Sequence, residues 1–133
     1  MTRVLALDHG SSLCGVAVSD PSGTIATPLE PVRTPSSKAG LGQLESLCNE
    51  RAVERVIVGL PLSLAGAETA QTEEARKFAD RLRQRLRGVP IELVDERLTT
   101  AEANSRGGEA AEDSRAAAVL LERWLEINGS TEL

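Results

Sequence analysis

Three acidic residues of this chain stand at the ends of predicted strands and helices. Asp8 ends the first apolar run. Glu96, with its neighbour Asp95, follows a later apolar run, and Asp113 opens the last predicted helix. Burying a carboxylate costs free energy unless it is paired, hydrogen-bonded or bound to a metal. Oxygen ligands suit Mg²⁺ or Mn²⁺, and two such ions about 3.5–4 Å apart can cleave a phosphodiester. The three acids therefore predict a catalytic divalent-cation site.

Helical periodicity favours Asp113 over its neighbour Glu112 as a site residue. At about 100° per residue, Asp113 falls on the apolar arc of the predicted helix 112–127. That arc also holds Ala117, Leu120 and Trp124. Glu112 falls on the opposite, charged arc, which is expected to face solvent. The alternative is an ordinary aspartate in the first helical turn, stabilised by the helix dipole.

Asp8 and the segment 95–100 also allow a simpler interpretation. Asp8 could bond only the amides of the turn that follows it, and 95–100 could be a capped turn with a surface ion pair. In the catalytic interpretation, Gly10 lets the backbone approach a ligand closely. Arg97, in the same segment as Thr99, could then bind phosphate through two parallel hydrogen bonds. The local sequence leaves both interpretations open.

The elements that must position these acids alternate between strands and helices. The predicted strands are 3–8, 14–18, 24–32, 55–60 and 89–94, and the predicted helices are 36–51, 68–87, 98–104 and 112–127. Three strands with short turns predict an antiparallel meander, which right-handed crossovers then extend. Residues 3–8, apolar on both faces, are expected to be central, and the Pro-interrupted 24–32 an edge. The pattern predicts one α/β domain over 1–133, with a mixed five-stranded sheet flanked by helices.

The charge distribution is uneven. The net charge of −5 argues against broad electrostatic capture of nucleic acid. Positive charge is concentrated in residues 76–87, on two arcs of one predicted helix. The first arc holds Arg76, Arg83 and Arg87, and the second holds Lys77, Arg81 and Arg85. One arc could contact substrate phosphates while the other is solvated, and a solvated face is the ordinary outcome for either.

Composition excludes several classes of protein. With one Phe, one Trp and no Tyr, the chain lacks the rings that a base-stacking platform needs. Cys14 and Cys48 have no metal-ligand spacing and are typical of reduced core thiols. No run reaches transmembrane length, and residues 1–3 lead straight into a strand without a signal-peptide layout. We expect a cytoplasmic protein without a membrane partner, whose oligomeric state the sequence does not indicate.

In this order, the motifs of the chain resemble those of the YqgF family over nearly its whole length. The first are Leu7-Asp8-His9-Gly10 and Gly15-Val16-Ala17-Val18-Ser19-Asp20. They are followed by Val58-Gly59-Leu60-Pro61-Leu62, then Gly66 and Gln71-Thr72. The last are Val94-Asp95-Glu96-Arg97-Leu98-Thr99-Thr100 and Asp113-Ser114-Arg115-Ala116-Ala117-Ala118-Val119-Leu120-Leu121. These small bacterial proteins are similar to Holliday junction resolvases and are regarded as pre-16S rRNA nucleases.

The resemblance implies a ribonuclease-H-like fold and a magnesium- or manganese-dependent nuclease. It places the catalytic, metal-binding site on Asp8, Glu96 and Asp113, with Asp20 and Arg97 in support. It implies structured RNA as the partner, in 5′-end maturation of pre-16S rRNA, with branched DNA as the second choice. Both substrates are backbone phosphates held in a defined shape, so the sequence does not separate them.

Two other functions stay open. The family usually carries Pro and a Lys-Arg pair after the first Asp, where this chain has the stretch 9–14 without basic residues. The family's longer basic segment before the last Asp is replaced by 101–112, with three acids against Arg106. These departures favour a catalytically weak or inactive nucleic-acid-binding or assembly module. The turn 8–12 also resembles the phosphate loop of actin-like sugar kinases and chaperone ATPases, but those need two such domains.

Overall fold

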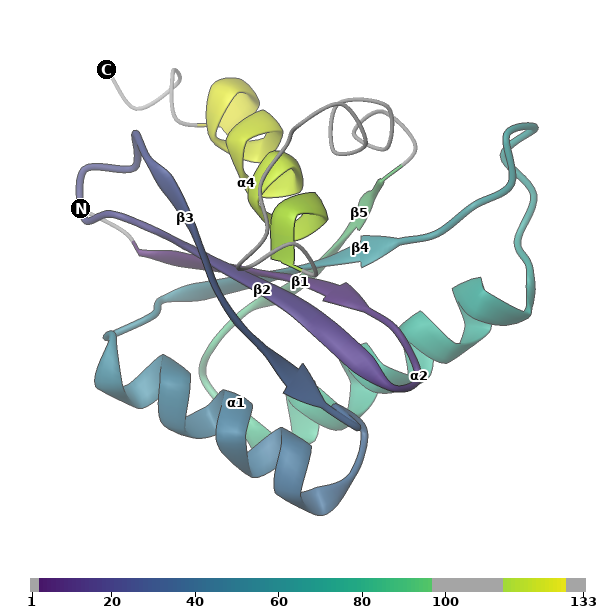
Figure 1. Cartoon of the computed structure of the whole chain (residues 1–133), viewed down its shortest axis with the longest axis horizontal. Coiled ribbons are helices and arrows are strands. Elements are labelled where there is room, and N and C mark those ends of the chain that lie inside the picture. Colours follow the sequence, from purple (N-terminus) through teal and green to yellow (C-terminus); the bar gives the residue numbers. More distant parts are fainter. Residues whose placement is uncertain (1–2, 97–113, 129–133) are drawn as a thin grey trace.

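The computed structural model describes residues 3–96 and 114–128, built around a five-stranded mixed sheet (Figure 1). The strands are β1 (Val4–His9), β2 (Leu13–Ser19), β3 (Ala26–Arg33), β4 (Arg55–Leu60) and β5 (Ile91–Asp95). Their order is β3-β2-β1-β4-β5, with β1 antiparallel to β2 and parallel to β4. The predictions that β1 is central and that β3 is an edge strand are confirmed.

Helices cover both faces of the sheet. The helices α1 (Lys38–Glu50) and α2 (Ala70–Arg85) lie on one face, and α4 (Arg115–Asn128) lies on the other (Figure 1). Ser37 caps α1, and Thr69 caps α2 through a capping box with Thr72. These caps supply acceptors for the free N–H groups of the first turn. The predicted helix 98–104 lies outside the described residues.

The side chains of the strands point alternately to the two faces of the sheet and form a hydrophobic cluster on each. The cluster on the α1 and α2 face includes Leu5, Leu7, Val56, Val58, Phe78 and Leu82. The cluster on the α4 face includes Val4, Ala6, Ile57, Ala117, Leu120 and Leu121. Because successive residues of a strand point to opposite faces, these clusters also fix the direction of the residues that follow at each strand end. The predicted apolar arc of α2 is confirmed, since Ala75, Phe78, Ala79, Leu82 and Leu86 are all buried.

The C-terminal ends of β1, β4 and β5 meet at one edge of the sheet, because these three strands are parallel. The turn from β1 to β2 also lies there, and α2 begins there because the chain leaves β4 at this edge. The hydroxyl of Thr72, in the first turn of α2, donates to the carbonyl of Pro61 and ties the helix start to the end of β4. In the part of the chain that the structure describes, no helix is long and apolar enough to span a membrane.

Candidate functional site

Asp8 points from the end of β1 toward the α4 face of the sheet. Its strand neighbours Val4 and Ala6 pack in the α4-side cluster, whereas Leu5 and Leu7 pack on the other side. Continuing this alternation by one step directs Asp8 to the α4 side and His9 to the α2 side. Asp8 is partly buried and pairs in register with Gly15 of β2. The predicted central-strand carboxylate therefore lies at the carboxyl edge of the sheet.

Glu96, rather than Asp95, shares the face of Asp8. Leu93 packs on the α2-side cluster and Val94 on the α4-side cluster, so Asp95 points away and Glu96 returns to the α4 side. The backbone N–H of Glu96 donates to the carbonyl of Leu60 at 3.4 Å, which carries the strand pairing one residue past the end of β5. The two adjacent acids of the sequence thus separate onto opposite faces.

Gly59 leaves the space in which the two carboxylates meet. It lies on β4, between the strands that carry Asp8 and Glu96, and it pairs with Val94 of β5. A Cβ atom at Gly59 would collide with Oε2 of Glu96 and would lie 3.4 Å from Cδ2 of Leu120. Any larger residue here would push the Glu96 carboxylate away from Asp8. The glycine is therefore part of the site, although it has no side chain.

The two carboxylates share a proton. Burial, the negative charge of Asp8 and the hydrogen bond to Asp8 together raise the pKa of Glu96 to about 8. The pKa of Asp8 is also raised by burial, which the hydrogen bond from Glu96 partly offsets. Two like charges this close cannot both ionise readily. In the metal-free protein near neutral pH, Glu96 therefore keeps a proton and donates it to Asp8.

The chemistry of this pair fits a hard divalent cation. It offers carboxylate oxygens only, which is the donor set that Mg²⁺ and Mn²⁺ prefer. A cation between the two groups would replace the shared proton and remove the repulsion that raises both pKa values. Across residues 3–96 and 114–128, no three His, Cys, Asp or Glu side chains group as metal ligands. The third predicted ligand, Asp113, lies outside the described residues, as do Arg97 and Thr99.

Ser114 anchors the start of α4 to β2 and β3. Its side chain is fully buried, and its hydroxyl donates to the carbonyl of Leu29 at 2.6 Å and accepts the N–H of Val16 at 2.9 Å. Val16 follows Gly15, the register partner of Asp8. The residue that follows Asp113 in the sequence is thus held next to the end of β1, on the α4 face. Ala117 and Leu120, expected on the inward arc with Asp113, are buried.

Gly10 and Asp20 have local structural roles. A Cβ on Gly10 would lie 2.7 Å from the carbonyl oxygen of Leu13, so the tight β1–β2 turn itself requires glycine. Asp20 follows β2 at the opposite edge of the sheet, where its carboxylate accepts the N–H groups of Thr24 and Ile25 at 2.8 and 2.9 Å. These bonds lower the pKa of Asp20. The structure does not bring Asp20 to the Asp8–Glu96 pair.

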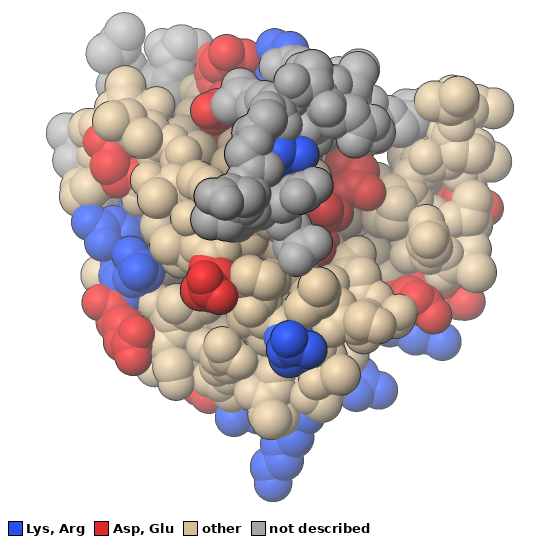
Figure 2. All heavy atoms as spheres, viewed as in Figure 1, with Lys and Arg blue, Asp and Glu red and all other residues tan. Residues whose placement is uncertain are grey.

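Two of the three basic residues predicted on the first arc, Arg76 and Arg83, are held by neighbouring acids. Arg76 forms an ion pair with Glu68 at 2.6 Å. Arg83 forms one with Asp80 at 2.8 Å and donates to the carbonyl of Ile91 at the start of β5, the end remote from the carboxylates. The structure therefore leaves Arg76 and Arg83 without a visible role in this site. Figure 2 shows, on the face in view, basic atoms along the lower edge, where Figure 1 places α1 and α2.

Sequence reasoning missed the roles of Gly59 and Ser114. Both belong to motifs that carried the family resemblance, yet neither has a reactive group that would single it out. The available signal was strand parity. Val58 is the register partner of Leu7, so Gly59, the next residue, stands level with Asp8. For Ser114, the signal was a small hydroxyl residue at the start of an apolar helix.

Comparisons with known proteins give the chain relatives along almost its whole length. A sequence model of the RuvX family, described as Holliday junction resolvase, matches residues 2–127. A relative from Anaeromyxobacter sp. (strain Fw109-5) is 42% identical, covering 93% of this chain and 96% of its own. One from Thermobifida fusca (strain YX) is 41% identical, covering 97% and 90%. Both relatives carry the provisional name pre-16S rRNA nuclease.

Among solved structures, RuvC from Thermus thermophilus matches with a TM-score of 0.60 and 18% identity, covering 98% of both chains. A second structure, of T. thermophilus RuvC in complex with a Holliday junction substrate, has the same TM-score at 16% identity. At this identity the likeness concerns the fold. It confirms the expected ribonuclease-H-like architecture with its mixed five-stranded sheet.

The sheet order and the carboxylate pair at the end of its central strand define a protein of the ribonuclease-H-like class. Within that class, the chain belongs to the RuvX family, as both the family match over residues 2–127 and the close relatives show. The family resemblance drawn from the sequence motifs is thereby confirmed. The chain is accordingly placed among nucleases.

Proposed function

We propose that this chain is a divalent-metal-dependent nuclease that hydrolyses phosphodiester bonds of pre-16S rRNA during maturation of its 5′ end. The observation that carries this proposal is the meeting of Asp8 and Glu96 across Gly59, at the carboxyl edge of the central strands. The provisional name of the relatives supports the choice of pre-16S rRNA. The nuclease class of the family supports the reaction type.

Asp8 and Glu96 would hold Mg²⁺ or Mn²⁺, and we propose Asp113 as a third ligand. Cations in such a site lower the pKa of the attacking water and stabilise the leaving oxygen in phosphodiester hydrolysis. Gly59 keeps the Glu96 carboxylate in reach of Asp8, and Ser114 fixes the start of α4 to β2 and β3. We propose that Arg97 and Thr99, which follow Glu96 directly, contact the substrate phosphate.

Resolution of a four-way DNA junction is the second candidate function. The description of the matching family as Holliday junction resolvase favours it. RNA and DNA both present backbone phosphates to such a site, so shape and the 2′-hydroxyl would decide between them. Relatives at 41% and 42% identity carry the rRNA name over nearly their full lengths, which makes pre-rRNA the first choice.

The test is a cleavage assay with purified protein, a 5′-extended pre-16S rRNA fragment and a four-way DNA junction. We expect cleavage of the RNA with Mg²⁺ or Mn²⁺, and none with a chelator. Asp8→Asn and Glu96→Gln should abolish cleavage while the protein stays folded. Glu92→Gln is the matched control, since Glu92 lies near the start of β5 in a partly exposed ion pair with Arg55, at the opposite end of the strand from Glu96.

Each outcome of this assay selects one function. Cleavage of the junction alone would replace the rRNA proposal with the resolvase one. Binding without metal-dependent cleavage of either substrate would support the inactive binding module. Wild-type activity of Asp8→Asn or Glu96→Gln would remove that residue from the site.

A further inference from the structure

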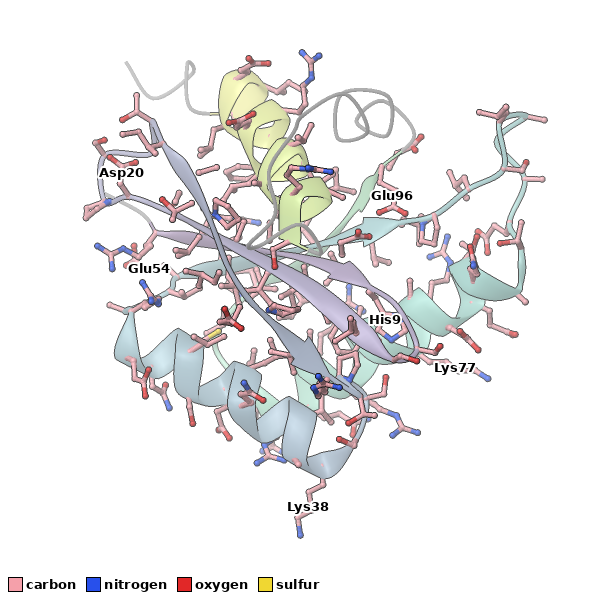
Figure 3. The ribbon with its side chains drawn as sticks, in the orientation of Figure 1. His9, Asp20, Lys38, Glu54, Lys77 and Glu96 are labelled. Atoms are coloured by element: carbon pink, nitrogen blue, oxygen red, sulfur yellow. The ribbon has the colours of Figure 1, made fainter. Side chains whose placement is uncertain are left out.

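A recess lies at the end of β1, on the face of the sheet opposite the carboxylate pair. It has a volume of about 250 Å³ and is lined by His9, Ser11, Ser36, Glu74, Lys77 and Arg81. Asp8 and His9 are consecutive residues of β1, so strand alternation sends one to the carboxylate site and the other to this recess. Figure 3 shows His9 and Lys77 on the α2 side of the sheet edge and Glu96 on the other side. We call this recess the His9 pocket.

The imidazole of His9 is held firmly in the wall of the pocket. Its ring stacks on Phe78 with centroids 4.6 Å apart and an interplanar angle of 30°. Phe78 is fully buried in the α2-side core, so it provides a fixed support. The Nε2 atom of His9 lies 3.4 Å from the hydroxyl of Ser36. The pocket therefore has a preformed polar wall at the edge of the sheet.

The cationic groups of the pocket come from one face of α2. Glu74, Lys77 and Arg81 are three and four residues apart, the spacing that places side chains together on a helix. Arg81 is oriented by a bond of 3.1 Å from its Nη1 to the carbonyl of Ser36. An arginine has five N–H donors, so this one bond does not exhaust its capacity.

Lys77 and Arg81 differ from the other basic residues of α2, because neither is in an ion pair with another described residue. Arg76, Arg83 and Arg85 form ion pairs with Glu68, Asp80 and Glu45, respectively. Lys77 is exposed and forms no ion pair with any residue in 3–96 or 114–128. Its ammonium group is thus available to an anion at the pocket.

We propose that the His9 pocket binds a backbone phosphate of the RNA strand, close to the phosphate that is cleaved at Asp8 and Glu96. This inference rests on the proposed nuclease function. Ammonium and guanidinium groups bind phosphate through strong charge-assisted hydrogen bonds, and the hydroxyls of the pocket can donate further ones. Ligand pockets for small molecules usually exceed about 300 Å³, so the smaller His9 pocket suits one phosphate and its sugar. The carboxylate of Glu74 opposes the two cations and moderates the affinity.

The pocket also offers positive charge to an RNA strand that approaches the negatively charged carboxylate site. The chain has a net charge of −5, and the carboxylate pair would repel a polyanion before a cation binds. The turn after β1, residues 10–12, has no charged side chain. Lys77 and Arg81 supply positive charge around His9, the residue that follows Asp8 in β1. A strand held there would be positioned for cleavage without a strongly basic protein surface.

His9 is the only histidine of the chain, so its imidazole signals in an NMR spectrum need no assignment. We expect these signals to shift on titration with a short single-stranded RNA in a chelator, where no cleavage occurs. Lys77→Gln should weaken the binding that causes the shift by at least about threefold. Inorganic phosphate should shift the same signals more weakly, and a DNA strand of equal length should compete. Unchanged His9 signals at saturating RNA would overturn the proposal.

Salt-dependent RNA binding in a chelator gives an independent measure with matched controls. Lys77→Gln should flatten the slope of log affinity against log salt by about 0.7, the loss of one single-strand phosphate contact. Arg87→Gln removes the same charge beyond the end of α2 and should leave the slope unchanged. Glu74→Gln should tighten binding by removing the opposing carboxylate, whereas Glu73→Gln, outside the pocket lining, should not. Equal effects of each variant and its control would refute a specific phosphate site.

The two proposals fail in different ways. If the wild type binds RNA through the His9 pocket but does not cleave it with metal, the nuclease proposal fails and the pocket stands. If the wild type cleaves RNA but Lys77→Gln changes neither the salt slope nor KM, the pocket proposal fails alone. Under both proposals, Lys77→Gln raises KM and leaves the cleavage rate at saturating RNA close to that of the wild type.

Discussion

Glu96→Gln should stabilise the metal-free protein at alkaline pH and leave its stability in mild acid almost unchanged. Folding raises the pKa of Glu96 from 4.5 to about 8, so the folded protein keeps a proton that the unfolded chain releases. Because the folded state binds more protons between these two pH values, the free energy of unfolding falls as the pH rises through that interval. Glutamine has no proton to lose there and can still hydrogen-bond to Asp8.

The size of the effect follows from the shift. One pKa unit corresponds to about 1.36 kcal/mol, so the full difference sets an upper bound of about 5 kcal/mol. Water reaches part of the Glu96 side chain and screens the interaction, so we expect Glu96→Gln to be about 1–3 kcal/mol more stable than the wild type at pH 8. The two proteins should converge near pH 4.5. Burial lowers the pKa of His9, so below its ordinary value of 6.5 this residue makes the free energy of unfolding rise with pH. That contribution is the same in the wild type and in Glu96→Gln.

Urea unfolding in a chelator, followed by tryptophan fluorescence, measures this difference. Trp124 is the only tryptophan and packs partly buried in α4, so its emission should report unfolding. Glu92→Gln removes a carboxylate from the same strand and should keep the pH profile of the wild type. Parallel profiles for the wild type and Glu96→Gln from pH 4.5 to 8 would refute the shared-proton description of the site.

Three further predictions test the site and its supports. Mn²⁺ should raise the Tm of the wild type but not of Asp8→Asn, and an equal rise in both would place the metal elsewhere. Gly59→Ala should abolish both this rise and cleavage while the protein stays folded, because the added Cβ displaces the Glu96 carboxylate. Gly42→Ala, which meets only the flexible end of Arg85, should retain both. Ser114→Ala should cost about 1–3 kcal/mol in urea unfolding, because it strips two buried backbone groups of their partner.

The sequence predicts the fold well because its strands and helices have clear periodicity. The strand 55–60 matches β4 exactly, and the apolar arc of 68–87 is the buried face of α2. The continuous apolar run before Asp8 indicates a strand covered on both faces, and β1 lies at the centre of the sheet with both clusters against it. Proline identifies the edge strand, because Pro28 and Pro31 in β3 have no N–H to donate to a second neighbour.

The site is harder to predict because carboxylates serve several purposes. Asp20 and Asp8 both follow strand residues in the sequence, yet Asp20 accepts the amides of its own turn. Only the strand direction separates them, since β1 and β2 are antiparallel and their ends lie at opposite edges. Three arginines of α2 similarly look available on a helical wheel, but acids from α1, from the helix itself and from the segment before it bind Arg76, Arg83 and Arg85. These partners depend on tertiary structure, which periodicity does not report.

The period-two alternation of β1 explains how an acidic protein can act on a polyanion. A basic side chain in direct contact with a carboxylate forms an ion pair with it, as Arg76 does with Glu68. Asp8 and His9, being consecutive, face opposite sides of a sheet whose two clusters are separate. The carboxylates therefore keep their oxygens for a cation on the α4 side, while Lys77 and Arg81 keep their positive charge on the α2 side. An RNA strand that crosses the sheet edge can contact both sides.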